Sequence, residues 1–239
     1  GDFEPTLAAL DQALEHLKNK DTLAAQVAGS SQHAALLKTK IRVAGQLNDE
    51  TAMAVARDEA AKFDVDGANG ASVLGTYHMQ RREYELAINA LREAVAYQPS
   101  DATALTALGQ CYQMLGRDED ARTAYERAVA ANRSAGQAHQ GLAILAKSKG
   151  DEATFEAQLA IVEQLMPQDP WVREQLLIRS EEADPEAAIA KRESQLSQKP
   201  DDVYSLQRLV LLYESVGQIA KADGHLERLL VLEPDDQRV

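Results

Sequence analysis

The sequence predicts an all-α fold, a solenoid of stacked antiparallel helix pairs. Ala, Leu, Glu and Gln carry most of the 239 residues, while only 13 are Gly and 7 are Pro, a mixture that favours helix. Four prolines, Pro99, Pro167, Pro200 and Pro234, are separated by 68, 33 and 34 residues, which indicates a repeat of 34 residues. Within each repeat, apolar residues recur at spacings of three and four around a central turn, as in two amphipathic helices.

Composition and charge narrow the functional classes. With 45% apolar residues the chain can bury a core, and with 38 acidic against 25 basic side chains its net charge is -13. Such a charge repels a phosphate backbone, so nucleic acid is not an expected partner. The mean hydropathy of -0.37 and the lack of any apolar run near ~18 residues predict a soluble chain with no membrane span.

The compartment is left open between cytoplasm and periplasm. The single cysteine, Cys111, cannot form an internal disulfide, so cysteine usage does not decide between them. No signal peptide is visible, but the chain begins with Gly1 rather than Met, so we expect a fragment of a longer protein.

The N-terminal third holds two predicted elements. Residues 1–33 predict a partial repeat helix and a connector, in which Gly29, Ser30 and Ser31 should interrupt any continuous helix. Residues 34–67 predict a degenerate helical hairpin, with helices over 34–48 and 50–63. Its apolar face consists of Leu37, Ile41, Ala44, Ala52, Val55, Ala56 and Ala60.

The remaining chain predicts five helical hairpins in succession. Their bounds are 68–101, 102–135, 136–169, 170–202 and 203–236. In the second hairpin, Gly109 and Ala121 let two backbones approach, and Leu108 and Tyr125 fill the space between the helices. A single hairpin cannot bury its apolar stripes, so each must pack on the next.

These hairpins resemble the tetratricopeptide repeat, whose signature is W-x2-L-G-x2-Y, then A-x3-F, then P. The second hairpin carries the resemblance best, with Leu108, Gly109, Tyr112, Ala121 and Tyr125. The fourth hairpin is weakest because it loses one residue around the turn 182–185, where we expect a local distortion. The resemblance covers 169 of 239 residues and implies a right-handed α-solenoid.

The sequence contains no pattern that indicates a catalytic or metal-binding site, so we expect a non-catalytic chain with no cofactor and no metal. No two of the five histidines are three to five residues apart, as helical metal ligands would be, and His78 and His139 fall at positions facing a hairpin interior. Cys111 has no base within a turn and is expected to be a buried filler. Acidic clusters near the inter-helix turns, including Glu181 with Glu182, are interpreted as solvated helix caps.

The resemblance implies a ligand surface on the concave wall, which first helices of such repeats form. The second, fifth, ninth and twelfth places of each hairpin face this wall. The predicted peptide-binding residues are Gln110, Gln113, Gln137, Gln140, Ile144, Trp171, Glu174, Ile178, Tyr204, Gln207 and Leu211. Carboxamides both donate and accept hydrogen bonds and so suit a peptide backbone, and Trp171 and Tyr204 would be anchors. The alternative is that the glutamines only fill solvated positions and that Trp171 covers a repeat junction.

The predicted function is a non-catalytic scaffold that binds a protein or extended peptide. Because Glu174, Glu181 and Glu214 outnumber Lys147 on the wall, the partner should be neutral or basic. The fifth places Ser72, Thr106, Gln140, Glu174 and Gln207 lack the basic residues with which chaperone-binding members hold a C-terminal carboxylate. Two alternatives remain: an arm of a larger enzyme or of a secretion or biogenesis complex, and a structural protein that self-associates end to end through apolar residues such as Leu226, Leu229 and Leu230.

Overall fold

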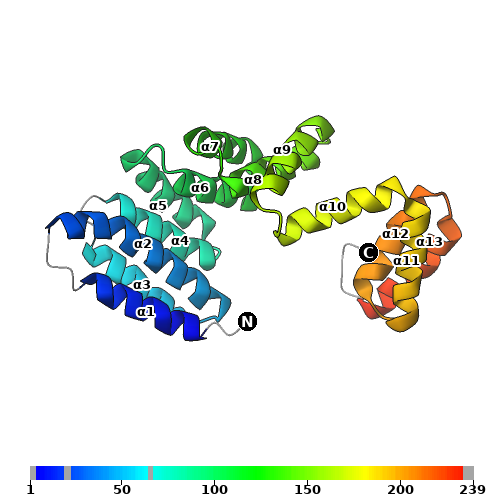
Figure 1. The fold of residues 1–239 in the computed structure, drawn as a ribbon, viewed down its shortest axis with the longest axis horizontal. Coiled ribbons are helices and arrows are strands. Elements are labelled where there is room, and N and C mark those ends of the chain that lie inside the picture. The colour runs from blue at the N-terminus through cyan, green and yellow to red at the C-terminus, as the bar shows by residue number, and fades with distance from the viewer. Residues whose placement is uncertain (1–3, 19–22, 64–66, 234–239) are drawn as a thin grey trace. The chain divides into compact units, whose positions relative to one another are not determined.

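The computed structural model describes residues 4–18, 23–63 and 67–233, and within these ranges every regular element is a helix (Figure 1). The all-α prediction is confirmed. The chain divides into two compact units, residues 1–165 and 166–239, and each is described by itself. The first unit holds α1 (Glu4–Lys18), α2 (Leu23–Gln46), α3 (Glu50–Phe63), α4 (Ala68–Gln80), α5 (Tyr84–Tyr97), α6 (Ala102–Met114), α7 (Asp118–Ala131), α8 (Gly136–Ser148) and α9 (Glu152–Leu165). The second holds α10 (Pro170–Ala183), α11 (Pro185–Gln198), α12 (Val203–Ser215) and α13 (Ile219–Leu232).

The turns inside the hairpins repeat one backbone conformation at the predicted period. The fifteenth place of the hairpins is in the left-handed region, with φ of 69° at Gly116, 71° at Gly150 and 74° at Gly217. Asn48 and Arg82 take the same conformation at the matching places further upstream, with φ of 56° and 59°. Side chains disfavour this region, which explains why glycine stands at three of the five turns.

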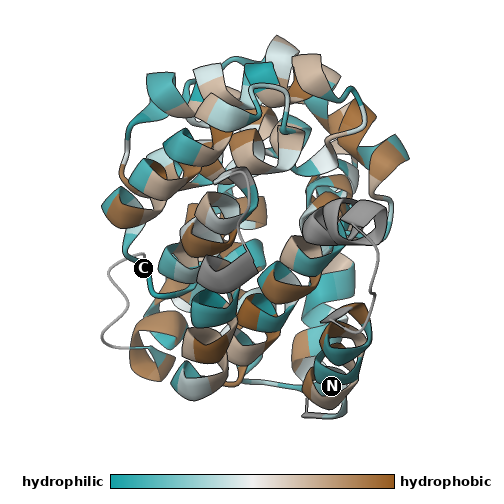
Figure 2. Cartoon of the chain, turned by 90° about the vertical axis from the view of Figure 1, so that its left-hand side faces the viewer, coloured by the Kyte–Doolittle hydropathy of each residue, from teal (hydrophilic) through white to brown (hydrophobic). Residues whose placement is uncertain are grey.

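Each helix is amphipathic and buries one stripe, and Figure 2 shows apolar and polar residues alternating along single helices. In the first unit α2 packs on α4, α4 on α5 and α6, and α6 on α7 and α8. The core around α6 contains Leu105, Leu108, Cys111 and Tyr112, which are all buried.

Tyr125 on α7 explains two glycines, the signature glycine Gly109 and Gly141 on the next first helix. Its ring fills the space that a Cβ would need at Gly109 on α6 and at Gly141 on α8, where such an atom would lie 2.6 Å and 2.4 Å from the ring. The tyrosyl hydroxyl donates a hydrogen bond of 2.8 Å to Gln113 Oε1. The glycines therefore admit one large ring between three helices, rather than only bringing two backbones together.

The N-terminal helices differ from the prediction in two respects. Val55, predicted on the apolar face of its hairpin, is 49% exposed, whereas Met53 is buried. The expected interruption at Gly29, Ser30 and Ser31 is wrong, because α2 continues from Leu23 to Gln46. Helix α1 packs on α2 through the buried Leu14 and through an ion pair of 2.5 Å between Asp11 Oδ1 and Lys40 Nζ. The weak helix propensity of the glycine and serines therefore does not end the helix.

The second unit shows the expected distortion of the fourth hairpin. A single residue, Asp184, separates α10 from α11, and its carboxylate accepts a hydrogen bond from the Ala187 N–H. Its φ of -143° replaces the left-handed turn found in the complete hairpins. The missing residue therefore removes the turn itself.

None of the described helices is long and apolar enough to cross a membrane.

Candidate functional site

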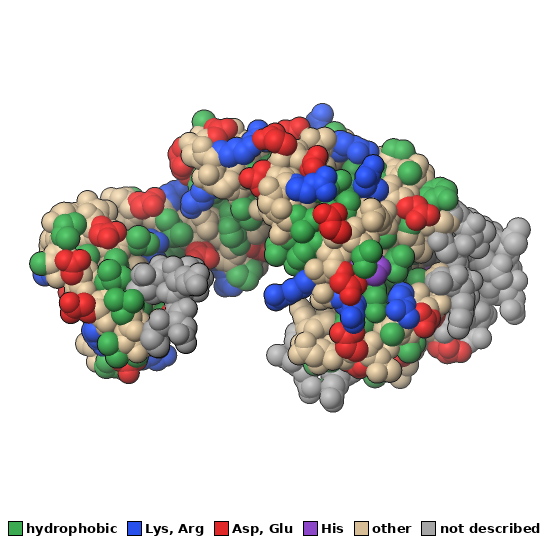
Figure 3. All heavy atoms as spheres, turned by 180° about the vertical axis from the view of Figure 1, so that it is seen from behind, with side chains coloured by type: hydrophobic (Ala, Val, Ile, Leu, Met, Phe, Trp, Pro, Cys, Tyr) green, Lys and Arg blue, Asp and Glu red, His purple; other side chains and the backbone are tan. Residues whose placement is uncertain are grey.

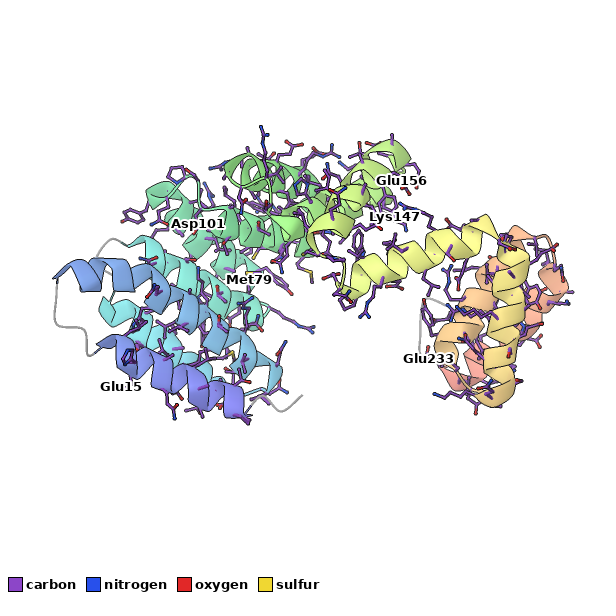
Figure 4. The ribbon with its side chains drawn as sticks, in the orientation of Figure 1. Glu15, Met79, Asp101, Lys147, Glu156 and Glu233 are labelled. Atoms are coloured by element: carbon purple, nitrogen blue, oxygen red, sulfur yellow. The ribbon has the colours of Figure 1, made fainter. Side chains whose placement is uncertain are left out.

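The candidate site of the first unit is the face formed by the first helices of its hairpins, α4, α6 and α8, together with α2. We call this the first-helix face and define it by the second, fifth, ninth and twelfth places of each hairpin. Helix α4 packs on α6 and α6 on α8, so these places come from neighbouring helices. Figure 4 marks Met79 on α4, Asp101 at the start of α6 and Lys147 on α8.

Asp101 fixes the start of α6 and so the register of its side chains. The carboxylate accepts hydrogen bonds from the N–H groups of Thr103 at 2.9 Å and Ala104 at 3.1 Å. Such an N-cap commonly contributes ~1 kcal/mol to a helix. Asp101 was not among the helix caps predicted from the sequence. The same arrangement recurs at Asp169 and Asp202 in the second unit.

The predicted glutamines lie partly accessible on this face. Gln110 and Gln113 on α6 are half-buried, Gln137 on α8 is exposed and Gln140 is half-buried. The carboxamide oxygen of Gln113 accepts a hydrogen bond from the Tyr125 hydroxyl. Its N–H groups are therefore the part of the side chain that can donate to a ligand. Ile144, also half-buried, adds an apolar position next to them on α8.

Lys38 on α2 belongs to the same face and was missed by the sequence analysis. Its ammonium donates a hydrogen bond of 3.1 Å to Ser72 Oγ on α4, and Ser72 is itself buried. Burial lowers the pKa of Lys38, the charge of Asp101 partly restores it, and the nearby Arg42 lowers it again. The sequence contains the signal for this position. When the 34-residue period is extended one hairpin upstream, to residue 34, Lys38 falls at the fifth place and Arg42 at the ninth.

The candidate residues of the second unit come from α10 and α12. Trp171 and Ile178 on α10 are half-buried and Glu174 is exposed. On α12, Gln207 is half-buried, while Tyr204 and Leu211 are exposed. The guanidinium of Arg192 from α11 stacks on the Tyr204 ring at 4.9 Å from its centroid, which fixes the orientation of that ring.

Glu181 corrects the predicted charge of this wall. It is 4% exposed and forms ion pairs with Arg192 Nη2 at 2.6 Å and Arg208 Nη2 at 2.8 Å. It is therefore neither a solvated cap nor an available acidic group. Glu174 and Glu214 keep their exposed positions, so the accessible face of the second unit is less acidic than expected.

His139 and Cys111 are buried and His78 is partly buried, in line with the interior positions predicted for them. His139 is buried and bonded through Nδ1 to Gln158 Oε1 at 2.7 Å and through Nε2 to the Arg133 carbonyl at 3.1 Å. His78 is partly buried and pairs with Glu83 Oε2 at 2.6 Å. Cys111 is fully buried. Among the described side chains, no group of three or more His, Cys, Asp or Glu residues could hold a metal ion.

The comparisons with known proteins concern the fold. Residues 73–137 match the profile of the tetratricopeptide repeat. No curated protein matches the sequence. A thermophilic TPR protein of Thermus thermophilus, TTC0263, superposes with a TM-score of 0.56 at 18% identity, covering 72% of this chain and 88% of that one.

Two MamA structures show weaker likeness. One has a TM-score of 0.45 at 18% identity and covers 82% of this chain and 95% of that one. The MamA fragment from residue 41 of Desulfovibrio magneticus RS-1 has a TM-score of 0.47 at 18% identity, with 71% and 98% covered. The profile match shows a tetratricopeptide repeat over residues 73–137, and the TTC0263 likeness and the helix pairs with turns at a 34-residue period show the fold of stacked helix pairs.

Proposed function

We propose that the chain is a non-catalytic scaffold that binds an extended peptide segment of a protein partner along its first-helix faces. The tetratricopeptide fold itself suggests a protein-interaction scaffold. The observation that carries the finer proposal is the row of partly accessible carboxamides, Gln110, Gln113, Gln137 and Gln140, on two neighbouring helices. A carboxamide can donate to and accept from a peptide group, while Gln113, whose oxygen is bonded to Tyr125, would donate, so the row recognises backbone more than side chains.

The second unit has a first-helix face of its own, on α10 and α12, which would supply anchors for a peptide bound there. Tyr204 is 38% exposed with its ring held by Arg192, and a fixed aromatic ring loses little conformational entropy on binding. Leu211 adds exposed apolar area on α12, and Trp171 adds half-buried apolar area at the start of α10. Because Glu174 and Glu214 are exposed, we infer a neutral or basic peptide whose binding weakens only modestly with salt.

Peptide selection tests the proposal. Random twelve-residue peptides are displayed on phage, selected on the full chain, and measured by fluorescence anisotropy. We expect Gln110→Ala/Gln137→Ala to weaken binding of the selected peptides at least tenfold. The control Gln98→Ala/Gln164→Ala removes two exposed carboxamides at the end of α5 and on α9 and should leave binding unchanged. Equal losses in both double variants would contradict the proposal.

The anchors have a test of their own. Trp171→Ala/Tyr204→Ala should cost ~2 kcal/mol or more in affinity while the far-ultraviolet circular dichroism stays helical. Normal binding by this variant would exclude the two side chains as anchors. Unfolding of the variant would instead assign Trp171 to packing at a repeat junction.

Self-association is a second candidate, favoured by apolar residues exposed on α13, although Leu229 of the predicted ridge is buried at 2% exposed. Ile219, Leu230 and Val231 are 53%, 47% and 80% exposed. Leu230 and Val231 are adjacent in the last turn of α13, and contiguous exposed apolar surface commonly marks contact surfaces. Sedimentation velocity should then show concentration-dependent association, and Leu230→Lys/Val231→Lys should abolish it. A monomer over the whole concentration range would exclude this candidate.

A further inference from the structure

We propose that the first unit carries a second docking site, which binds an acidic peptide segment by enclosing one of its apolar side chains. The site is a cavity of about 350 Å³ between α5 and α7, with α6 as its floor. This proposal is independent of the first-helix face. Leu108 and Tyr112, which form the floor, lie on the side of α6 opposite Gln110 and Gln113, as the 3.6-residue helical period requires.

The floor of the cavity is apolar and preformed. Leu108 and Tyr112 of α6, Val95 of α5 and Ala124 of α7 line it, and each is at most 9% exposed. Ligand cavities range upward from ~300 Å³, so this one has room for one large apolar side chain and its neighbours rather than for a whole folded element.

The rim of the cavity is basic although the chain as a whole is acidic. Arg92 on α5 and Arg127 on α7 are exposed lining residues, and within the described chain neither guanidinium has an ion-pair partner. The acidic lining residue, Asp120, is already paired with Arg117 Nη2 at 2.8 Å. In Figure 3, Lys and Arg side chains lie among Asp and Glu side chains at the top of the larger unit.

The charge of the rim decides the occupant. Two unpaired guanidinium groups beside an apolar floor complement a segment that carries carboxylates next to an aromatic or leucine side chain. A basic or neutral segment would leave both guanidinium groups without a partner. The site therefore selects the opposite charge from that inferred for the first-helix face of the second unit, and the scaffold can hold two different segments.

A defined probe tests the site. The probe is a fluorescein-labelled peptide with one Phe flanked on each side by two Glu, and its anisotropy is measured with the full chain. We expect saturable binding that weakens at least tenfold when the Phe is replaced by Ala, and again when the Glu residues are replaced by Lys. Absence of binding to the wild-type chain, or equal binding of the Ala peptide, would overturn the proposal.

Variants locate the probe on the protein. Arg92→Glu/Arg127→Glu should weaken binding at least tenfold, whereas Arg173→Glu, an exposed arginine on α10, should not. Thr123→Trp fills the cavity from an exposed lining position and should also abolish binding, with Ala130→Trp on the same helix as its control for bulk. Unchanged binding by the arginine pair variant or by Thr123→Trp would overturn the proposal. Gln110→Ala/Gln137→Ala should bind this probe normally, so failure here is distinguishable from failure of the first-helix face.

Discussion

Glu181 on α10 and Arg192 on α11 form a buried ion pair, with Glu181 Oε1 2.6 Å from Arg192 Nη2 and both residues no more than 5% exposed. The other carboxylate oxygen, Oε2, pairs with Arg208 from α12. One carboxylate therefore joins three helices of the second unit. It does so beside the shortened turn at Asp184, where the two helices of the fourth hairpin lack the turn that the complete hairpins share.

Removing this carboxylate should destabilise the second unit. In Glu181→Ala both arginines stay in or near the core without their counter-ion, and breaking a buried pair in this way costs ~3 kcal/mol or more. Glu182→Ala removes the neighbouring exposed carboxylate and should change the free energy of unfolding by less than ~0.5 kcal/mol. Urea unfolding followed by circular dichroism measures both. Equal stability of the two variants would mean that the pair contributes nothing.

A methyl group added at Gly109 should also destabilise the chain. Its Cβ would meet the Tyr125 ring at 2.6 Å, and overpacking of this kind costs ~1–3 kcal/mol, more than the ~1 kcal/mol that alanine gains in helix propensity. Gly224 on α13 is the matched control, because a Cβ there has no neighbour within 4 Å. We expect Gly224→Ala to raise the urea midpoint and Gly109→Ala to lower it. A stabilised Gly109→Ala would show that the Tyr125 ring can move aside.

Cys111 should be inert to thiol reagents in the folded chain. Burial raises its pKa to about 12, so almost no thiolate exists at pH 8, and the side chain is inaccessible as well. Labelling with dithionitrobenzoate should proceed at least ~100-fold more slowly in buffer than in denaturant. Fast labelling of the native chain would refute the role of Cys111 as a core filler.

The helix pairs were predictable because their causes are local and periodic. Glycine at the left-handed turns, Asp101 as an N-cap, and the spacing of Leu105 and Leu108 are each visible within one repeat. The same 34-residue period, extended to the hairpin that begins at residue 34, also places Lys38 on the first-helix face. A continuous α2 was not predictable from Gly29, Ser30 and Ser31, because their low helix propensity favours an interruption.

The buried environment of Glu181 was not predictable from the sequence either. Its partners are 11 and 27 residues away on two other helices, and no helical spacing relates them. A glutamate close to an inter-helix turn therefore looks like a solvated cap until the packing is known. Likewise, the bond between Tyr125 and Gln113 joins a core residue to a predicted binding residue, and only the fold brings them together.

His225 on α13 provides a pH-dependent contribution to the stability of the second unit. Its ring stacks on Tyr213 of α12 at 5.6 Å between centroids and 9° between planes. Burial lowers the pKa of His225 below 6.5, and the charges of Arg228 and Lys221 lower it further, against an opposing effect of Glu193. Within the described chain, its Nδ1 atom is buried without a hydrogen-bond partner, so the neutral ring is the form that the fold accepts.

Acidification should therefore destabilise the chain through His225. Because the unfolded chain binds this proton more readily, the stabilisation is complete above pH 6.5 and is lost as the pH falls from 6.5 toward the lower folded pKa. We expect the urea midpoint of the wild-type chain to fall between pH 7.5 and pH 5.5, and His225→Gln to reduce that fall. The control His16→Gln replaces an exposed histidine on α1 and should leave the pH dependence intact. If the fall persists in full in His225→Gln, other groups cause it and His225 does not.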